Sequence, residues 1–491
     1  MPDAVVVGSG PNGLAAAFVL ASAGLSVTVY EAAPTPGGGC RTEELTLPGF
    51  RHDVCSAVHP LAAGSGFFQR YDVPAHGVRL LKPPVAFAHP LGGGRSAVVT
   101  GSVEETAGRL GSDASTYTSL MRPLVDHADG IVDSVLSTMR AVPSDVAGAA
   151  LFARLGLQSV SHLARRFQGV EARALVSGVG AHSIRPLDRA GTGGVALLLS
   201  LLAHSVGWPI VEGGSQAITD SLVAAVTQLG GEVVPDVTVR RLEELPDARL
   251  VMLDTSPSSL LTLAGDRLPS GYARRLSRYR YGPGVCKVDW ALSEPVPWSS
   301  AECRRAGTVH VGGDSYEVAR AESEVCHGRH PAQPFVLCTQ PGVVDATRAP
   351  SGRHTLWTYC HVPSGSDRDM SAQIASQIER FAPGFSDVVL AKSVETAADC
   401  ADRNPNYVGG DIACGVQDLR QTFGRPVWRW DPYRTPLRGV YLCSSATPPG
   451  PGVHGRCGEL AALSALRHEL GIRRPPELAP GMRRLHERRP A

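Results

Sequence analysis

The sequence of 491 residues lacks the signals of several protein classes. Its 47 basic and 46 acidic residues leave a net charge of +1, which gives no electrostatic reason to expect nucleic acid binding. The longest apolar stretch, residues 195–203, is much shorter than the roughly 20 residues that span a bilayer. No charged leader precedes an apolar run at the N-terminus. We therefore expect a cytoplasmic protein without a transmembrane segment.

Cysteine pairs and lysines are also scarce. The closest of the 11 cysteines, Cys326 and Cys338, are 12 positions apart, so the chain has no C-x-x-C motif. This spacing argues against a structural metal site, a thioredoxin-like dithiol and the cysteine pair of flavin disulphide reductases. Only three of the 47 basic residues are lysines, and one of them, Lys287, lies within an apolar strand-forming segment.

The first 31 residues carry the strongest positive signal. A β-branched run at 4–7 enters the turn GSGPNG, a helical segment follows at 14–23, and a second strand at 26–30 ends on an acid. The three glycines of such a turn permit the sharp bend, the approach of a pyrophosphate and close helix packing. The helix N-terminus offers N–H groups to phosphates, and the acid can bind ribose hydroxyls. The pattern predicts a dinucleotide-binding fold with cofactor contacts at Gly8, Gly10, Pro11, Gly13, Glu31 and Ala32.

A second glycine cluster, GGGCRT at residues 37–42, follows six residues after the acid. A flexible surface loop is one interpretation. The order of acid, glycines and arginine resembles the second flavin fingerprint of the amine oxidase and phytoene desaturase superfamily. That resemblance implies contacts between the flavin cofactor and Gly38, Arg41 and Thr42, although the usual arginine position is occupied by Gly39. In the same superfamily the backbone at the position of Val239 contacts the adenine.

A third glycine-rich segment follows the strand-like residues 439–443 and precedes a helical run at 459–470. Its sequence, SSATPPGPGVHGRCG, formally repeats the dinucleotide motif, so a second nucleotide site is one alternative. It lacks the following strand and acid of such a site. It resembles instead the closing motif of phytoene desaturase-like flavoproteins, which implies flavin contacts at Gly452, Val453 and His454, with Ser444 and Ser445 in the place of an acid.

Four segments together resemble one protein family along nearly the whole chain. They are GFRHDVCSAVHPLA (49–62), GPGVCKVDWAL (282–292), NPNYVGGDI (404–412) and YLCSSATPPGPGVHGRCG (441–458). They are similar to phytoene dehydrogenase-related flavoproteins, and the closest branch is that of the pyridine-nucleotide-disulphide-oxidoreductase-domain proteins. The resemblance implies non-covalent FAD, two domains and an apolar substrate cavity over the flavin.

The expected fold class is α/β, with a discontinuous Rossmann-like FAD-binding domain and an interleaved α+β substrate domain. We assign 1–80, 207–281 and 395–472 to the first, 81–206 and 282–394 to the second, and 473–491 to an Arg/Pro-rich tail. The tail is expected to be disordered, with a membrane-surface contact as the alternative. The patterns also predict helices at 115–139, 161–183, 191–206 and 219–229, strands at 285–292 and 354–361, and a hairpin-like strand pair at 232–241.

The predicted function is FAD-dependent dehydrogenation of a C–C bond in a hydrophobic or natural-product-like molecule, with dioxygen or a quinone as electron acceptor. The alternatives are an amine oxidase acting on a C–N bond, and a non-redox flavin-binding isomerase or interaction protein. Candidate catalytic residues are Lys287 and Asp289, which strand alternation places on one face, and His59. Trp357 and His361 share a strand face and are candidate substrate contacts.

Overall fold

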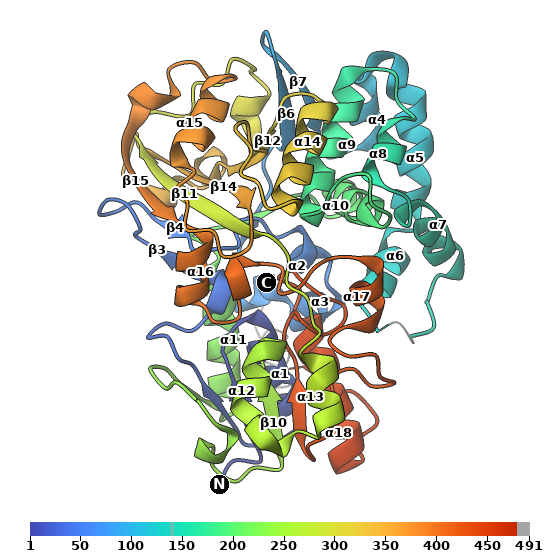
Figure 1. Ribbon diagram of the computed structural model, residues 1–491, viewed down its shortest axis with the longest axis vertical. Coiled ribbons are helices and arrows are strands. Elements are labelled where there is room, and N and C mark those ends of the chain that lie inside the picture. The colour runs from blue at the N-terminus through green and yellow to red at the C-terminus, as the bar shows by residue number, and fades with distance from the viewer. Residues whose placement is uncertain (139–140, 479–491) are drawn as a thin grey trace, which may run out of the picture.

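A five-stranded parallel sheet forms the lower half of the molecule in Figure 1. The computed structural model describes residues 1–138 and 141–478. The strand order is β16–β10–β1–β2–β9, and neighbouring strands pair in parallel. The strands are β1 (Ala4–Val7), β2 (Val27–Tyr30), β9 (Glu232–Val234), β10 (Leu250–Leu253) and β16 (Val440–Leu442).

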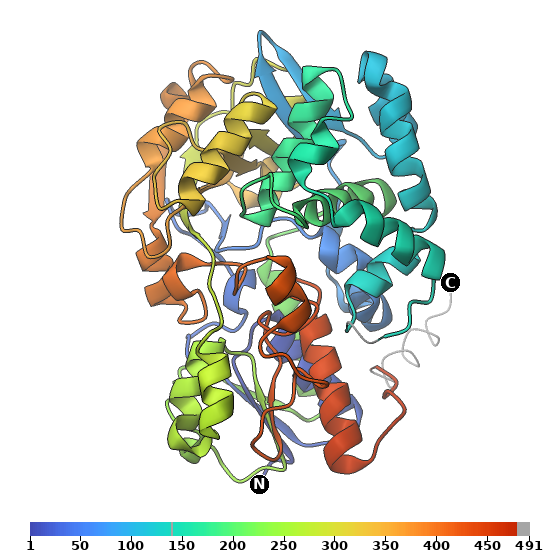
Figure 2. The ribbon, with the colours of Figure 1, turned by 45° about the vertical axis from the view of Figure 1, so that its right-hand side comes forward.

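Helices cover both faces of this sheet, as parallel sheets require. Ala4 and Val6 pack with α1 (Pro11–Ser22), α11 (Gln216–Gln228) and α18 (Arg456–Leu470). The alternate strand residues pack on the other face, with α12 (Pro257–Ala264) and α13 (Ser270–Leu276). Figure 2 shows the strands between the red helix α18 and the yellow-green helices α12 and α13. The all-apolar run at 4–7 is therefore a fully buried strand, as its sequence predicts.

A seven-stranded sheet forms the upper half (Figure 1). All its neighbouring strands pair antiparallel, except β12 and β6, which pair in parallel. In spatial order the strands are β15 (Val389–Glu395), β11 (Gly284–Leu292), β14 (His354–Val362), β13 (Val336–Thr339), β12 (Ala306–Val311), β6 (Val85–Gly92) and β7 (Arg95–Val99).

Two apolar layers enclose the upper sheet. One face carries Trp357 and Tyr359 and packs on a helical layer of α4 (Val103–Gly108), α5 (Ala114–Asp126), α6 (Ala128–Val135), α7 (Val146–Gly156), α8 (Val160–Ala164), α9 (Val170–Gly180), α10 (Thr192–Ser205) and α14 (Ser315–Cys326). The other face packs on α15 (Ser371–Glu379), with α16 (Ala397–Arg403) next to it. The shorter elements are β3 (Thr42–Glu43), β4 (His52–Asp53), α2 (Pro60–Gly64), α3 (Gly66–Tyr71), β5 (Leu80–Leu81), β8 (Ile210–Val211) and α17 (Leu419–Gly424).

The predicted α/β class and Rossmann-like sheet are confirmed, and the strands expected at 285–292 and 354–361 are present as β11 and β14. The helices expected at 191–206 and 219–229 correspond to α10 and α11, whereas the helical stretch at 115–139 is divided into α5 and α6, and that at 161–183 into α8, α9 and a final 3-10 turn. The proposed domain bounds remain a prediction. Among the described residues no helix has the length and apolarity of a membrane span.

The hairpin-like pair predicted at 232–241 is wrong, because only β9 forms there. Pro235 follows β9 directly and has no N–H for a strand ladder. Asp236 then adopts a positive φ of 57°, and Val237 donates its N–H to the carbonyl oxygen of Glu31 at 2.8 Å. The chain therefore crosses the end of β2 at this point and reaches the carboxyl ends of the parallel strands.

The C-terminal tail lies only partly within the described residues. Residues 473–478 have no regular secondary structure, but Leu478 packs into the core of the parallel sheet. The prediction of disorder for 479–491 falls outside the described residues.

Close packing of α1 on α18 gives a test of the fold. A methyl group at Gly458 of α18 would overlap the carbonyl oxygen of Asn12, so the helices would have to separate. We expect Gly458→Ala to destabilise the protein by about 2 kcal/mol, measured by urea unfolding. Gly271 of α13 has no neighbour within 4 Å of an added methyl, so Gly271→Ala should be neutral or slightly stabilising. Equal stability of the two variants would contradict this packing.

Candidate cofactor and substrate site

A cavity of about 1390 Å³ lies between the two sheets. Its lower part is lined by the ends of β1, β2 and β10 and by the glycine-rich turns that follow β1 and β16. Its upper part, which we call the apolar chamber, is lined by Phe152 of α7, Val195 and Leu198 of α10, Leu337 of β13 and Trp357 of β14. The volume exceeds the 300–1,000 Å³ typical of a single ligand pocket. It has room for a dinucleotide and a second molecule.

The lower part is built from backbone at two glycine turns. Gly8, Gly10 and Pro11 line it at the start of α1. A side chain at Gly38 would come within 3.1 Å of the Cα atom of Gly10, so the first and second glycine turns contact each other. The two turns therefore bring backbone rather than side chains to the cavity at the N-terminus of α1, where anions are favoured.

Glu31 stands at the end of β2, where its carboxylate organises the first turn. One carboxylate oxygen accepts hydrogen bonds from the Ser9 N–H at 2.8 Å and the Ser9 hydroxyl at 2.6 Å. The other accepts the Ala33 N–H at 2.8 Å. Glu31, Ala32 and Val239 line the cavity together. A carboxylate has about four acceptor positions, and three are used here, so the acid still has capacity for a ribose hydroxyl.

Asp254 is a cavity residue that the sequence analysis missed. It follows β10, whose last residue pairs with the end of β1, so the parallel register brings it beside the first glycine turn. Its Oδ2 atom accepts the Gly13 N–H at 2.9 Å and would lie 2.7 Å from a side chain at Gly10. Burial, together with the charge of Glu31, raises the pKa of Asp254 to about 7 although the Gly13 hydrogen bond opposes this.

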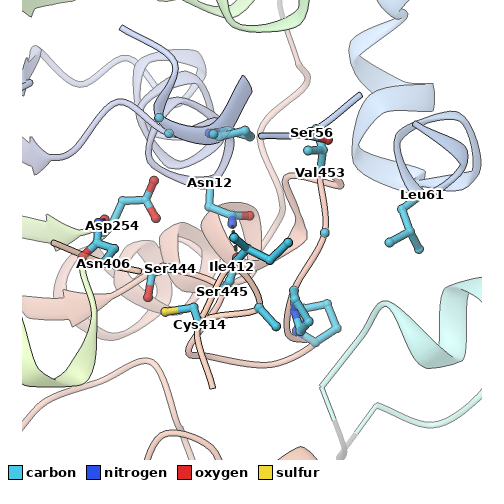
Figure 3. A pocket seen from close by; sticks show the side chains of 18 of the residues that line it. Asn12, Ser56, Leu61, Asp254, Asn406, Ile412, Cys414, Ser444, Ser445 and Val453 are labelled. Carbon is cyan, nitrogen blue, oxygen red and sulfur yellow. Dashed lines mark hydrogen bonds between the residues drawn. The ribbon is translucent and has the colours of Figure 1, made fainter. Parts of the chain in front are cut away.

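The loop before α17 and the third glycine turn complete this region (Figure 3). Asn406 accepts the Ser256 N–H at 2.7 Å and donates to the Asp254 carbonyl oxygen at 3.2 Å. Asn12 donates to the Ser445 hydroxyl at 3.3 Å, and its buried Oδ1 atom has no partner among the described residues. An unpaired buried acceptor beside a helix N-terminus fits a site completed by a ligand donor or by water.

A buried arginine also contacts the third turn. Arg425 is 2% exposed, lines the cavity and donates to the Ser445 carbonyl oxygen at 2.9 Å. The sequence contains no motif that would single it out among its many arginines. Its guanidinium therefore contacts Ser445, one of the two serines that occupy the place of the acid in the closing motif.

Gly452, Val453 and Arg41, which are predicted cofactor contacts, line the cavity. Three other predicted contacts, Gly13, Thr42 and His454, do not line it. The Gly13 N–H is occupied by Asp254. Thr42 donates to Asp53 at 2.8 Å. His454 contacts the Gly450 carbonyl oxygen at 3.1 Å and accepts the Arg456 N–H at 3.0 Å, so it stabilises its own turn. These three residues therefore stabilise, without lining it, the lower part of the cavity around Gly8, Gly10 and Gly38, which we call the cradle.

Lys287 and Asp289 lie on one face of β11, but neither lines the cavity. They form a buried ion pair behind the cavity wall, where Trp357 and Tyr359 are their cross-strand neighbours. The Lys287 ammonium is 5.9 Å from the centroid of the Trp357 ring. Burial raises the pKa of Asp289 to about 6 against the opposing charge of Lys287. A separate pocket of about 10 Å³ adjoins Lys287, with space on the order of one water molecule.

A second buried ion pair continues behind the wall. Arg348 donates to Asp53 Oδ2 at 2.5 Å, and Asp53 Oδ1 accepts the Ser215 N–H at 2.8 Å. His52 Nδ1 is 3.6 Å from Asp289 Oδ1, and burial with the neighbouring cations lowers the pKa of His52 to about 3. At neutral pH His52 is therefore uncharged. The two ion pairs connect the upper sheet to the N-terminus of α11.

His59 is not at the cavity surface, contrary to its predicted catalytic role. Its Nε2 atom is 2.9 Å from the Ser215 hydroxyl, which itself donates to the Ser56 carbonyl oxygen. The imidazole N–H must therefore donate to the hydroxyl. Burial lowers the pKa of His59 to about 4. His59 holds the loop that places Ser56 on the cavity wall.

Of the two predicted substrate contacts, Trp357 and His361, only the first lies at the cavity. Trp357 lines the cavity, and its buried indole N–H has no partner among the described residues. His361 does not line it, because its Nδ1 atom is bonded to Glu322 at 2.8 Å in the buried interior. Both positions are on one strand face, as alternation predicts, but a helix layer covers His361. No group of three or more metal-ligating side chains occurs among the described residues.

Comparisons with known proteins agree with this geometry. Residues 6–71 match the model of the NAD(P)-binding Rossmann-like domain. The chain is 26% identical to pyridine nucleotide-disulfide oxidoreductase domain-containing protein 2 of Rattus norvegicus, over 95% of this chain and 93% of that protein. It is 22% identical to the lycopene-forming phytoene desaturase of Pseudescherichia vulneris, over 96% of this chain and 99% of that enzyme.

Solved structures share the fold along the chain. An oxidoreductase from Methanosarcina mazei has a TM-score of 0.62 at 16% identity, covering 94% of this chain and 99% of that one. Cyclohexylamine oxidase from Brevibacterium oxydans has a TM-score of 0.57 at 15% identity, covering 96% and 100%. The chain therefore shares its fold with these oxidoreductases. Its sequence relatives include a pyridine nucleotide-disulfide oxidoreductase domain-containing protein and a phytoene desaturase.

The buried Lys287–Asp289 pair leads to a stability prediction. Lys287→Met leaves a carboxyl group in an apolar site without its cation, and we expect a loss of about 3 kcal/mol in urea unfolding. The double variant Lys287→Met/Asp289→Leu should recover most of it. Lys392→Met is the control, because Lys392 is an exposed strand lysine whose ammonium donates to the Ser371 hydroxyl and is in no buried ion pair of the described residues. Unchanged stability of Lys287→Met would contradict a buried charged pair.

Proposed function

We propose that this protein is an FAD-dependent dehydrogenase that introduces a C=C bond into a hydrophobic small molecule. The observation that carries the proposal is the single cavity that joins a backbone-lined dinucleotide cradle to an apolar chamber. Full-length similarity to a phytoene desaturase supports the same class of reaction. The residues that define the apolar chamber are uncharged, which favours substrates that bind by area burial.

The residues of the cradle fit FAD. Gly10 and Gly38 would allow the diphosphate to approach the backbone, and Glu31 would bind the adenosine ribose. Val239 would contact the adenine, while Gly452 and Val453 would lie at the flavin end. When bound, FAD would accept the hydride from one carbon while a proton leaves the neighbouring carbon, and dioxygen or a quinone would then reoxidise it.

The chain would contribute mainly position and exclusion of water. Trp357, Tyr359 and Leu337 form a stiff wall on the upper sheet, opposite the apolar side chains of α10. Burial raises the pKa of the Tyr359 hydroxyl, so it cannot serve as a base near neutral pH. We propose that Lys287 and Asp289 act from behind this wall, as positioning residues rather than as groups that touch the substrate. Orientation of an unactivated C–H bond is then the main source of rate.

Amine oxidation remains the competing function, since amine oxidases share the fold. Anaerobic mixing of the oxidised protein with phytoene, squalene, farnesol, putrescine and cyclohexylamine separates the two. We expect saturable loss of flavin absorbance with at least one of the isoprenoids and none with the amines. Reduction by an amine, with release of peroxide in air, would replace desaturation by amine oxidation. No reduction by any probe would favour a non-redox role.

Asp254 predicts how cofactor affinity depends on pH. With a pKa of about 7, its carboxyl group is neutral below that pH and charged above it. A negative charge next to Gly10 would repel the diphosphate, so we expect FAD to bind about tenfold more weakly at pH 8.5 than at pH 6. The effect is measured by titrating apo-protein with FAD.

Two variants make the test specific. Asp254→Asn should bind FAD with the same affinity at both pH values, since its side chain carries no titrating proton. Asp402→Asn removes an exposed acid from the cavity rim and should keep the parent pH dependence. Equal pH profiles for the parent and Asp254→Asn would show that Asp254 does not titrate against the cofactor.

A further inference from the structure

A pair of histidines stands at one end of the apolar chamber. His182, in the 3-10 turn Ala181–Ser183 after α9, is half-buried and lines the cavity. Its Nε2 atom is 3.0 Å from Nε2 of His310 on β12, which is completely buried. Because Nε2 is engaged by His310, only Nδ1 of His182 remains to bond a ligand.

The register of the upper sheet relates these histidines to the rest of the wall. His310 pairs with Leu337, Leu337 pairs with Tyr359, and Tyr359 pairs with Lys287. Leu337 and Tyr359 line the cavity, so the row crosses the sheet under the apolar chamber. His182 therefore marks the end of this row opposite Lys287. A molecule lying along the row would have an apolar middle and one polar contact at its end.

We propose that His182 hydrogen-bonds an uncharged oxygen, a hydroxyl or a carbonyl, at one end of an otherwise apolar substrate. The inference rests on the proposed function, because it names the substrate class of the same cavity. A pure hydrocarbon would cover His182 and leave its ring nitrogen without a partner, at a cost of about 1–3 kcal/mol.

The charge state of the pair excludes an anionic group. Burial, with a smaller contribution from His361, lowers the pKa of His182 to about 3, and burial also lowers the pKa of His310. At neutral pH the pair is uncharged and offers no cation to a carboxylate.

Because the two rings meet through their Nε2 atoms, His182 can bond either a hydroxyl or a carbonyl oxygen through Nδ1. One ring must donate its N–H and the other must accept it. If His182 donates through Nε2, its Nδ1 accepts from a hydroxyl; if it accepts, Nδ1–H donates to a carbonyl. His310 thus acts as a positioning residue that fixes the ring, with no contact to the substrate.

Binding of three matched probes tests the proposal on the protein as purified. Farnesol, β-farnesene and farnesoate share a C15 isoprenoid skeleton and differ at one end. Farnesol has a hydroxyl there, farnesoate has a carboxylate, and β-farnesene has no oxygen. We expect farnesol to bind about tenfold more tightly than β-farnesene in calorimetric titrations at pH 7, the value of one good hydrogen bond. Farnesoate should bind no better than β-farnesene. Equal affinities for farnesol and β-farnesene would overturn the proposal.

Variants assign the preference to His182. His182→Phe should weaken farnesol to the level of β-farnesene without changing the latter, and His182→Gln, which keeps hydrogen-bonding groups, should restore part of the difference. His204→Phe alters a half-buried histidine that bonds Tyr117 and does not line the cavity, so it should keep the parent preference. A parent-like preference in His182→Phe would overturn the assignment.

These outcomes are distinct from those of the proposed function. A hydroxyl preference that depends on His182 without flavin reduction by any probe would leave the binding site standing and remove desaturation. Flavin reduction by hydrocarbons with no role for His182 would do the reverse.

Discussion

The structure depends on the close approach of backbone around the N-terminus of α1. Added methyl groups at Gly13 and Gly458 would overlap the carbonyl oxygens of Gly8 and Asn12, and one at Gly38 would press on Gly10. Only residues without a side chain allow β1, α1, α18 and the second turn to meet. The same contacts place the N-terminus of α1 at the cavity. Packing of the parallel sheet and construction of the cofactor cradle are thus one constraint.

Buried charge joins the cradle to the upper sheet. The Arg348–Asp53 and Lys287–Asp289 pairs are dehydrated, so each is costly unless all its members are present. Asp53 also holds the N-terminus of α11, and Ser215 connects it to His59 and Ser56. Side chains that resemble catalytic groups in the sequence therefore fix the position of the cavity wall. Lys287, Asp289 and His59 do not line the cavity and lie behind the residues that do.

The cavity separates its two tasks along its length. The lower part presents backbone groups and Glu31, which suit a polar cofactor with a diphosphate and a ribose, and it also contains Asp254 next to Gly10. The upper part presents aliphatic and aromatic side chains, with His182 as a neutral polar end. A hydrophobic molecule in the upper part would lie next to the bound cofactor and would exclude water from it. Specificity then lies in the shape of the chamber and in the polar groups that line it, among them the His182 ring and the Trp357 indole N–H.

The sequence by itself determined the features that depend on local order. The strand–turn–helix–strand pattern and Glu31 were predictable because glycine spacing and alternation act within about thirty residues. The alternation that places Lys287 beside Asp289 was equally local. The tertiary structure decided the rest. Parallel pairing of β10 with β1 brings Asp254 to Gly13, 241 positions away. A helix layer covers His361, and Trp357 lies between Lys287 and the cavity. His182 becomes a cavity residue only through contact with His310, 128 positions away, a pairing that no local pattern encodes.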